Sequence, residues 1–334
     1  MTDCNWPYRL TDKRVWVAGH TGMVGSAIVQ RLALENCTIL TVPRSRLDLR
    51  CQADVTDWVS KTAPDSIVVA AATVGGIQAN YERPAEFLYD NLTIETNVIN
   101  AAYQANVDRL LFIGSACIYP RGAAQPITED ALLTGALEPT NEWYSIAKIA
   151  GIKLCEAYRR QYGCNYIAAM PNNLFGPNDN FDLESSHVIP ALIRKIHEAK
   201  FLSIDSLTLW GSGEPMREFM HVDDMADAAV FLLKFYSDYQ HINISSGEEI
   251  SIRDLAALIA EVVGWKGTFN FDSRKPDGAP QRLLDNSRLK QMGWRASTSL
   301  REGLTQTYAW YCKHHKSLSA SPVPSTNTVS QRTP

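Results

Sequence analysis

A tyrosine and a lysine stand four residues apart in the segment YSIAK, at Tyr144 and Lys148. On a helix this spacing places both side chains on one face. A phenol with a pKa of about 10 is a weak acid–base group at neutral pH, but a nearby ammonium favours its phenolate. A tyrosine tuned in this way can give a proton to a carbonyl oxygen while hydride reaches the carbonyl carbon. The same spacing is common on helix surfaces, so the interpretation depends on the rest of the chain.

A hydroxyl and a thiol, Ser115 and Cys117, follow the apolar run of residues 109–113. Ser115 ends a predicted strand, where its hydroxyl can hydrogen-bond the same carbonyl as Tyr144. Hydride transfer needs no thiol. A thiol beside a ketone can instead remove a proton from the adjacent carbon, because the ketone stabilises the resulting enolate. The alternative is a cysteine packed as a small apolar side chain.

Inversion of that carbon centre needs a second acid–base group on the opposite face of the substrate. His187, in the segment SHVIP, opens a helix-like stretch, and histidine titrates near neutral pH. Cys117 and His187 therefore form a candidate epimerase pair. A structural histidine is the alternative interpretation.

Three glycines spaced G-x-x-G-x-x-G stand between a predicted strand at 14–18 and a predicted helix at 25–34. Glycine permits the tight turn and the close backbone approach of a dinucleotide loop, which places a pyrophosphate at the positive end of the helix. The predicted loop residues are Gly19, His20, Thr21, Gly22, Met23, Val24 and Gly25. The alternative is a glycine-rich turn that only packs.

The end of the second predicted strand selects the nicotinamide, because an acidic residue there binds the ribose of NAD and an arginine suits a 2′-phosphate. The sequence has Arg44 and Arg46 at this place and no carboxylate. NADP(H) is therefore the expected cofactor; solvated loop charges are the alternative. Asp48 and Leu49 lie where the adenine is expected. Two more residues, Asn91 and Asn97, are left open between cofactor contact and plain surface.

Short apolar runs alternate with helical patterns through the first half of the chain. The predicted strands are 14–18, 37–42, 66–72, 110–115 and 166–171, and the long predicted helices are 87–104 and 142–162. This alternation predicts an α/β fold, a Rossmann-type doubly wound parallel sheet with a smaller C-terminal α/β substrate lobe. The predicted NADP-binding domain is 12–171 with a returning segment at 219–246; the lobe is 172–218 and 247–315. A tail rich in Ser, Pro and Thr at 317–334 is predicted to be disordered.

The composition is that of a globular protein, with 334 residues and a formal net charge of −4. This charge gives no reason to expect nucleic acid or an anionic membrane as partner. The seven cysteines are scattered and contain no Cys-x-x-Cys, so we expect reduced thiols and no metal site. With no signal-like or membrane-spanning run, a cytoplasmic protein is expected.

Longer segments carry a more specific resemblance than the glycine loop. They are GSACIYP, LEPTNEWYSIAKIAGIKLCEAY, PNNLFGPNDNF, SHVIPALIRK, WGSGEPMREFMHVDDMADA and KPDG, in order from residue 114 to residue 278. The glycine loop, the serine and the YxxxK pair resemble the extended short-chain dehydrogenase/reductase family, and these segments resemble its GDP-L-fucose synthase branch. The resemblance implies 3,5-epimerisation of GDP-4-keto-6-deoxy-D-mannose followed by NADPH-dependent reduction of the 4-ketone.

The resemblance also implies roles for individual residues. Cys117 and His187 match the positions that carry epimerisation, and Ser115, Tyr144 and Lys148 match those that carry reduction. The nicotinamide is expected along Pro171, Asn172, Asn173, Leu174, His187 and Lys148, and the GDP-sugar at Lys195, Trp210, Arg217 and Asp277. The two long helices resemble the family's dimer interface, so a homodimer is expected.

The chain departs from the family pattern at Ala116, Asn172, Phe175, Asn178 and Lys195. None of these changes removes a proposed acid, base or hydride-site residue, so they bear on substrate detail. Two other functions stay open: a related nucleotide-sugar epimerase or reductase, such as one for a 3,6-dideoxy sugar, and a non-catalytic dinucleotide sensor. A sensor has no need of the serine, tyrosine and lysine.

Overall fold

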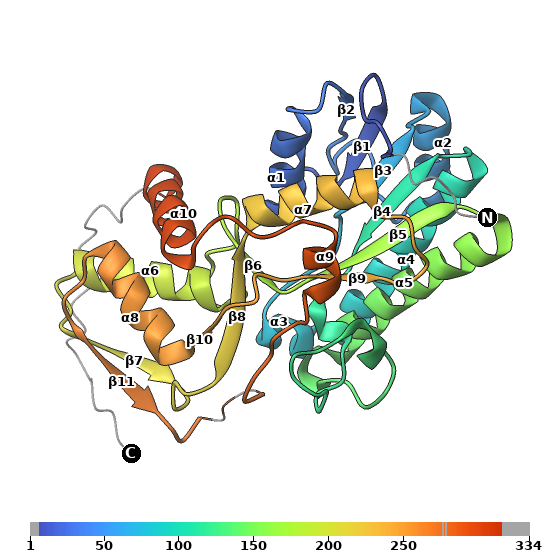
Figure 1. The fold of residues 1–334 in the computed structure, drawn as a ribbon. Helices are drawn as coiled ribbons and strands as arrows, with labels where there is room; N and C mark the ends of the chain where they lie inside the picture. The colour runs from blue at the N-terminus through green and yellow to red at the C-terminus, as the bar shows by residue number, and fades with distance from the viewer. Residues whose placement is uncertain (1–6, 276, 278, 316–334) are drawn as a thin grey trace, which may run out of the picture.

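The computed structural model describes residues 7–275, 277 and 279–315. Its centre is a parallel sheet of six strands in the order β2-β1-β3-β4-β5-β9 (Figure 1). The strands are β1 (Arg14–Ala18), β2 (Thr38–Leu40), β3 (Ser66–Val69), β4 (Arg109–Ile113), β5 (Asn165–Pro171) and β9 (Ile242–Ile244). All residues of β3 and β4 are buried, as expected for strands of a sheet covered on both faces.

Helices cover both faces of this sheet. One face carries α1 (Met23–Leu32) and α7 (Val222–Phe235); the other carries α2 (Gln52–Thr62), α4 (Pro84–Gln104) and α5 (Glu142–Tyr162). Successive residues of a strand point to opposite faces, so Val15 and Val17 pack in the first core and Trp16 in the second. The predicted doubly wound Rossmann-type fold is confirmed.

Two predicted strands are shorter in the structure than the apolar runs that suggested them. β2 pairs with β1 only from Thr38 to Leu40 and ends before Pro43, which has no amide hydrogen to donate. β3 ends at Val69, where β1 also ends, although the apolar run continues to Ala72. Strand length here follows the pairing partner, which a single segment does not reveal.

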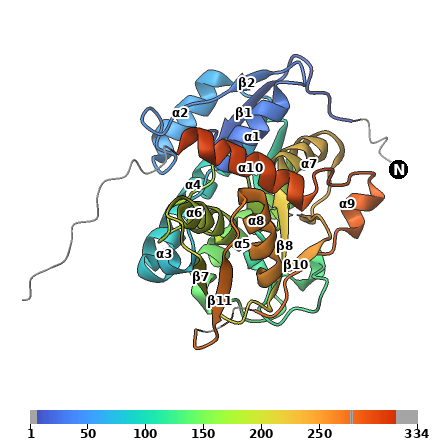
Figure 2. The same cartoon turned by 90° about the vertical axis from the view of Figure 1, so that its left-hand side faces the viewer.

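The second lobe has its own sheets and its own core. β6 (Asn173–Phe175), β8 (Met216–His221) and β10 (Glu249–Ser251) form one sheet, and β7 (Ser206–Trp210) pairs in parallel with β11 (Thr268–Asp272). The helices α6 (Val188–Phe201), α8 (Ile252–Val263) and α10 (Leu300–His314) lie beside these strands (Figures 1 and 2). A third apolar core lies between the strands and these helices. The short helices are α3 (Ile77–Glu82) and α9 (Ser287–Gln291). The tail predicted at 317–334 lies outside the described residues.

Parallel strands end at a common edge of the sheet, and the candidate catalytic and binding residues follow these strand ends. β1 runs into the glycine loop, β4 into Gly114 and Ser115, and β5 directly into Asn172. Among the residues that the structure describes, no helix combines the length and apolar character needed to cross a bilayer.

Candidate active site

Two glycines let the chain turn tightly from β1 into α1. Gly19 has a φ of +90°, and a Cβ there would lie 2.6 Å from the amide nitrogen of Ala71. A Cβ on Gly25 would overlap the carbonyl oxygen of Gly19. The first and third glycines of the spacing seen in the sequence are therefore required by the close approach of neighbouring backbone.

The N-terminus of α1 is open to an anion. Gly22 is its N-cap, no side chain caps the helix, and its first turn contains no acidic residue. The first amides of such a helix are free to bind phosphate oxygens. The other predicted loop residues, His20, Thr21, Met23 and Val24, belong to the same turn. This cradle fits the pyrophosphate of a dinucleotide.

Arg44 and Arg46 are exposed beyond the end of β2. Within the described part of the chain neither side chain makes a hydrogen bond or an ion pair. Two exposed guanidinium groups with no hydrogen bond or ion pair suit a 2′-phosphate, and the charge of Arg44 is close enough to lower the pKa of Asp48. The residues present therefore fit NADP(H).

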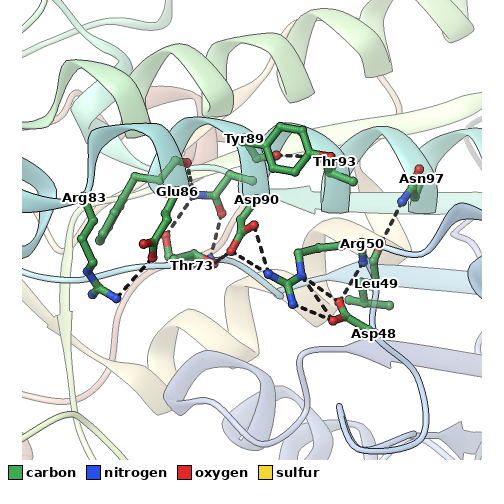
Figure 3. A network of polar contacts seen from close by, with 12 residues as sticks. Asp48, Leu49, Arg50, Thr73, Arg83, Glu86, Tyr89, Asp90, Thr93 and Asn97 are labelled. Atoms are coloured by element: carbon green, nitrogen blue, oxygen red, sulfur yellow. Dashed lines mark hydrogen bonds and ion pairs between the residues drawn. The ribbon is translucent and has the colours of Figure 1, made fainter.

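A polar network fixes the loop that follows β2, where the sequence led us to expect the adenine (Figure 3). Arg50 contacts Asp48 at 2.7 Å and Asp90 of α4 at 3.2 Å. Its hydrogen bonds lower the pKa of Asp48 to about 2. The carboxylate of Asp48 is thus already engaged within the protein. Arg50 was missed in the sequence, although its position two residues after an aspartate was a usable signal.

Both asparagines that the sequence left open have structural contacts. Asn97 is buried on α4 and donates from Nδ2 to the carbonyl of Leu49 at 2.9 Å (Figure 3). Asn91, also buried, accepts from the Thr73 amide at 2.8 Å and donates to the Thr73 carbonyl at 2.9 Å. Neither residue is plain surface: each ties a loop at the cofactor edge to α4.

Ser115 and Cys117 lie in one tight turn after β4. The turn is a short 3₁₀ helix, Ala116–Ile118, and the Ser115 hydroxyl caps it by accepting from the Cys117 amide at 3.4 Å. Hydroxyl and thiol are held together by the backbone, as the sequence predicted. Both residues as a whole are only partly buried.

Tyr144 and Lys148 share one face of α5, beside the end of β4. The Lys148 ammonium lies 5.8 Å from the centre of the Tyr144 ring and donates to the Ile113 carbonyl at 3.2 Å. Burial raises the pKa of Tyr144 well above its ordinary value, and the charges of Cys117 and Glu95 add to the increase. The sequence led us to expect that the ammonium favours the phenolate; in the structure, burial acts on the pKa of Tyr144 in the opposite direction and favours the protonated phenol.

The surroundings of Cys117 act on its thiol in opposite directions. Burial raises its pKa, while the hydroxyls of Ser115 and Ser145 lower it. Positive charge has the same lowering effect, with Arg282 contributing more than Lys148. Arg282 donates from Nη2 to the carbonyls of Ala116 at 2.8 Å and Tyr119 at 3.1 Å. The sequence offered no signal for this arginine, because 166 positions separate it from Ala116.

His187 is the N-cap residue of α6, at the turn where the predicted helix begins. The preceding turn is tied to the loop after β3, since the Gly76 amide donates to the Ser185 carbonyl at 2.9 Å. The His187 ring makes no hydrogen bond or ion pair to any described residue. The residue is solvent-accessible, yet enough protein surrounds the ring for desolvation to lower its pKa. Both ring nitrogens of His187 are therefore free of partners among the described residues and available for proton transfer.

The predicted nicotinamide segment continues the central strand β5 into the second lobe. Pro171 pairs with Ile244 of β9, and Leu174 pairs with Met220 of β8. Asn173 donates from Nδ2 to the Glu218 carbonyl at 2.9 Å. Asn172 is buried, and neither polar atom of its amide has a partner among the described residues. Of the two amides, that of Asn172 is the one free for a ligand.

Three of the four predicted substrate residues lie near further charged or polar groups. Burial lowers the pKa of Arg217, and so does the nearby Arg282, so two guanidinium groups approach each other. Trp210 is 75% exposed and has the Lys275 ammonium 5.1 Å from its ring centre. Asp277 accepts from the Ser212 amide at 2.9 Å and from its hydroxyl at 2.7 Å.

Lys195 stands apart from these groups in its contacts. It is half-buried on α6, and its ammonium has no hydrogen bond or ion pair within the described residues. The structure gives no contact that joins Lys195 to Arg217 or Trp210. Its assignment to the substrate stays a prediction.

Comparison with known proteins places the chain in a family. The profile of the NAD dependent epimerase/dehydratase family matches residues 15–245. GDP-L-fucose synthase of Sinorhizobium fredii is 58% identical over 90% of this chain and 96% of its own. GDP-L-fucose synthase 1 of Arabidopsis thaliana is 55% identical over 91% of this chain and 95% of its own.

Among solved structures, a GDP-L-fucose synthetase from Naegleria fowleri bound to NADP superposes with a TM-score of 0.86 at 26% identity, covering 93% of this chain and 97% of the other. The match therefore extends over both lobes. The chain belongs to the NAD dependent epimerase/dehydratase family, in the branch that contains the GDP-L-fucose synthases.

Proposed function

We propose that this protein converts GDP-4-keto-6-deoxy-D-mannose to GDP-L-fucose, by epimerisation at C3 and C5 and NADPH-dependent reduction at C4. One observation carries the proposal beyond simple reduction: the turn after β4 holds a hydroxyl and a thiol together, next to Tyr144 and Lys148. A single ketone bound at this turn is within the reach of both chemistries.

Epimerisation uses the acidity of the carbons beside the ketone. The Cys117 thiolate removes a proton from the carbon, and the electron pair moves into the carbonyl to give an enolate. His187, as imidazolium, returns a proton to the other face of the same carbon and inverts it. The Ser115 hydroxyl and the cationic Arg282 support this step, because both favour the thiolate.

Reduction uses the same carbonyl after the two centres are inverted. NADPH, held by the glycine loop and by Arg44, supplies a hydride to C4 when bound. Tyr144 gives its proton to the carbonyl oxygen, which Ser115 also hydrogen-bonds. Lys148 orients the phenol from the next turn of α5. Its ammonium stabilises the phenolate that remains after Tyr144 has given up its proton.

The nucleotide half of the substrate is held by the second lobe. Arg217 and Arg282 form a cationic pair that suits a diphosphate, and the exposed Trp210 offers a surface for stacking. Lys195 and Asp277 complete the proposed set. Arg282 also contacts the turn of Cys117. In this proposal Arg282 therefore lies between the diphosphate of the substrate and the carbon that loses its proton.

The test is turnover of GDP-4-keto-6-deoxy-D-mannose with NADPH by the full chain. We expect one NADPH consumed per sugar and a product identical to GDP-L-fucose by NMR. A reduced product that keeps the D-manno configuration would leave only a reductase. No reaction with this sugar, together with reaction of a related dideoxy substrate, would favour the related nucleotide-sugar function.

The assembly proposed for the protein is a homodimer through α4 and α5. Their surface exposes large apolar side chains, Tyr89, Trp143, Ile146 and Tyr162. Such a patch on a helix pair is typical of an interface between identical subunits. We expect a dimer by light scattering and a monomer for Tyr89→Glu, while Tyr239→Glu, an equally exposed tyrosine elsewhere, stays dimeric.

The compartment proposed is the cytoplasm. The six cysteines that the structure describes are all unpaired, which suits a reducing environment. Fractionation of cells that express the protein with a small epitope tag tests this assignment.

A further inference from the structure

A carboxylate lies buried directly beneath the reductase residues. Glu95, on α4, places Oε1 2.9 Å from Nζ of Lys148, and the two side chains are only 1% and 2% exposed. Neither oxygen of Glu95 has another hydrogen-bonding partner among the described residues. Burial raises the pKa of Glu95, and the neighbouring Lys148 ammonium acts against this shift, so the contact with Lys148 is what favours the charged carboxylate.

The packing around the pair leaves little freedom for either ion. α4 and α5 lie side by side (Figure 1). Gly151 of α5 provides the room for Glu95: a Cβ there would lie 2.7 Å from Oε2 and would overlap the ring of Phe112. Lys148 lies 4.6 Å from the centre of the same Phe112 ring and donates to the Ile113 carbonyl. The ammonium is thus fixed by a carboxylate, a ring and a carbonyl.

The charged and titratable groups that face Glu95 all come from α5. They are Lys148, Tyr144 and Cys155. The strand β4 contributes only the apolar ring of Phe112 and the Ile113 carbonyl to this site. Glu95 has Lys148 as its close cation, and its charge also reaches the Tyr144 phenol.

We propose that Glu95 is a positioning residue for the reduction: its carboxylate holds the Lys148 ammonium in place beside Tyr144, and its negative charge favours the protonated form of the Tyr144 phenol. This inference rests on the proposed roles of Tyr144 and Lys148. Glu95 does not touch the substrate, and it acts only through these two residues.

The direction in which removal of the Glu95 carboxylate shifts the pH–rate profile can be predicted. Negative charge from Glu95 raises the pKa of Tyr144, so Glu95→Gln lowers it. The same substitution removes the anion that holds Lys148, so the ammonium is no longer fixed in place. Reduction needs the Tyr144 proton, which is then lost at lower pH. The basic limb of the pH–rate profile therefore moves to lower pH.

The experiment compares three variants of the full chain. Glu95→Gln removes the charge. Glu95→Asp keeps the charge on a side chain that is one methylene shorter, so the carboxylate lies farther from Lys148. Glu86→Gln makes the same chemical change as Glu95→Gln at an exposed place on α4. For each we measure the pH profile of kcat/KM for ketone reduction and, by NMR of ¹³C-labelled tyrosine, the titration of Tyr144, assigned with Tyr144→Phe. The NMR readout needs neither substrate nor turnover.

For Glu95→Gln we expect a basic limb lower by about one pH unit or more. The rate at neutral pH should fall roughly tenfold or further, since small displacements of a catalytic group cost up to about 100-fold. Glu95→Asp should show a smaller shift in the same direction, and Glu86→Gln none. A uniform loss of rate with an unmoved basic limb would overturn the proposal. If the wild type fails to reduce the sugar, the proposed function fails, and an unmoved Tyr144 titration separately overturns the role of Glu95.

Discussion

Arg282 donates from Nη2 to the carbonyl of Ala116 at 2.8 Å, which places a guanidinium from the second lobe beside the thiol of Cys117. The arginine is partly buried, and burial lowers its pKa. A positive charge near a cysteine favours the thiolate, which is the form that removes a proton from carbon. The contact therefore couples the second lobe to the turn that holds the proposed base.

Arg282→Gln is expected to slow modification of Cys117 by iodoacetamide at neutral pH by about tenfold, because a lost neighbouring cation raises a thiol pKa by about one unit or more. Peptide mass spectrometry separates Cys117 from the other cysteines. Arg282→Lys, which keeps the charge, should react at nearly the wild-type rate. Equal rates for all three proteins would show that the guanidinium does not act on the thiol.

The double variant Arg44→Ala, Arg46→Ala is expected to lose preference for NADPH. Each arginine offers charge-assisted hydrogen bonds to a 2′-phosphate, so KM for NADPH should rise about 10- to 100-fold. NADH has no 2′-phosphate and serves as the internal control, with unchanged kinetics. A parallel loss with both cofactors would mean that the two arginines support the loop and do not read the phosphate.

The pH profile of proton exchange should be broad and flat around neutrality. Exchange needs thiolate at Cys117 and imidazolium at His187; the pKa of Cys117 is raised and that of His187 is lowered. Between the two values, a rise in pH gains thiolate as fast as it loses imidazolium. The rate of deuterium entry in kcat/KM should therefore fall only below the usual histidine range and above the usual cysteine range. A narrow bell centred near neutrality would contradict this pair.

The fold could be predicted because its signals are local. β1 and α5 have the bounds expected from their apolar patterns, and Gly19 and Gly25 are explained by steric contacts that any larger residue would violate. The lengths of β2 and β3 could not be predicted, because they depend on the strand alongside.

The site could be predicted where its residues share one segment. Ser115 with Cys117, and Tyr144 with Lys148, are close in the sequence and close in the structure. Glu95 and Arg282 were not found, because each reaches the site across the fold from a different element. The sign of the pKa shift of Tyr144 was also beyond the sequence, since burial depends on packing.

The most direct test of the account is deuterium incorporation during turnover in D₂O, with wild type, Cys117→Ser and Tyr144→Phe compared. The wild type should give a fucose-configured product with deuterium at C3 and C5 and one NADPH consumed. Cys117→Ser should suppress deuterium entry far more than Tyr144→Phe does, while Tyr144→Phe should exchange the protons but stall before reduction. NADPH consumption without deuterium entry in the wild type would contradict the account and return Cys117 to a packed thiol.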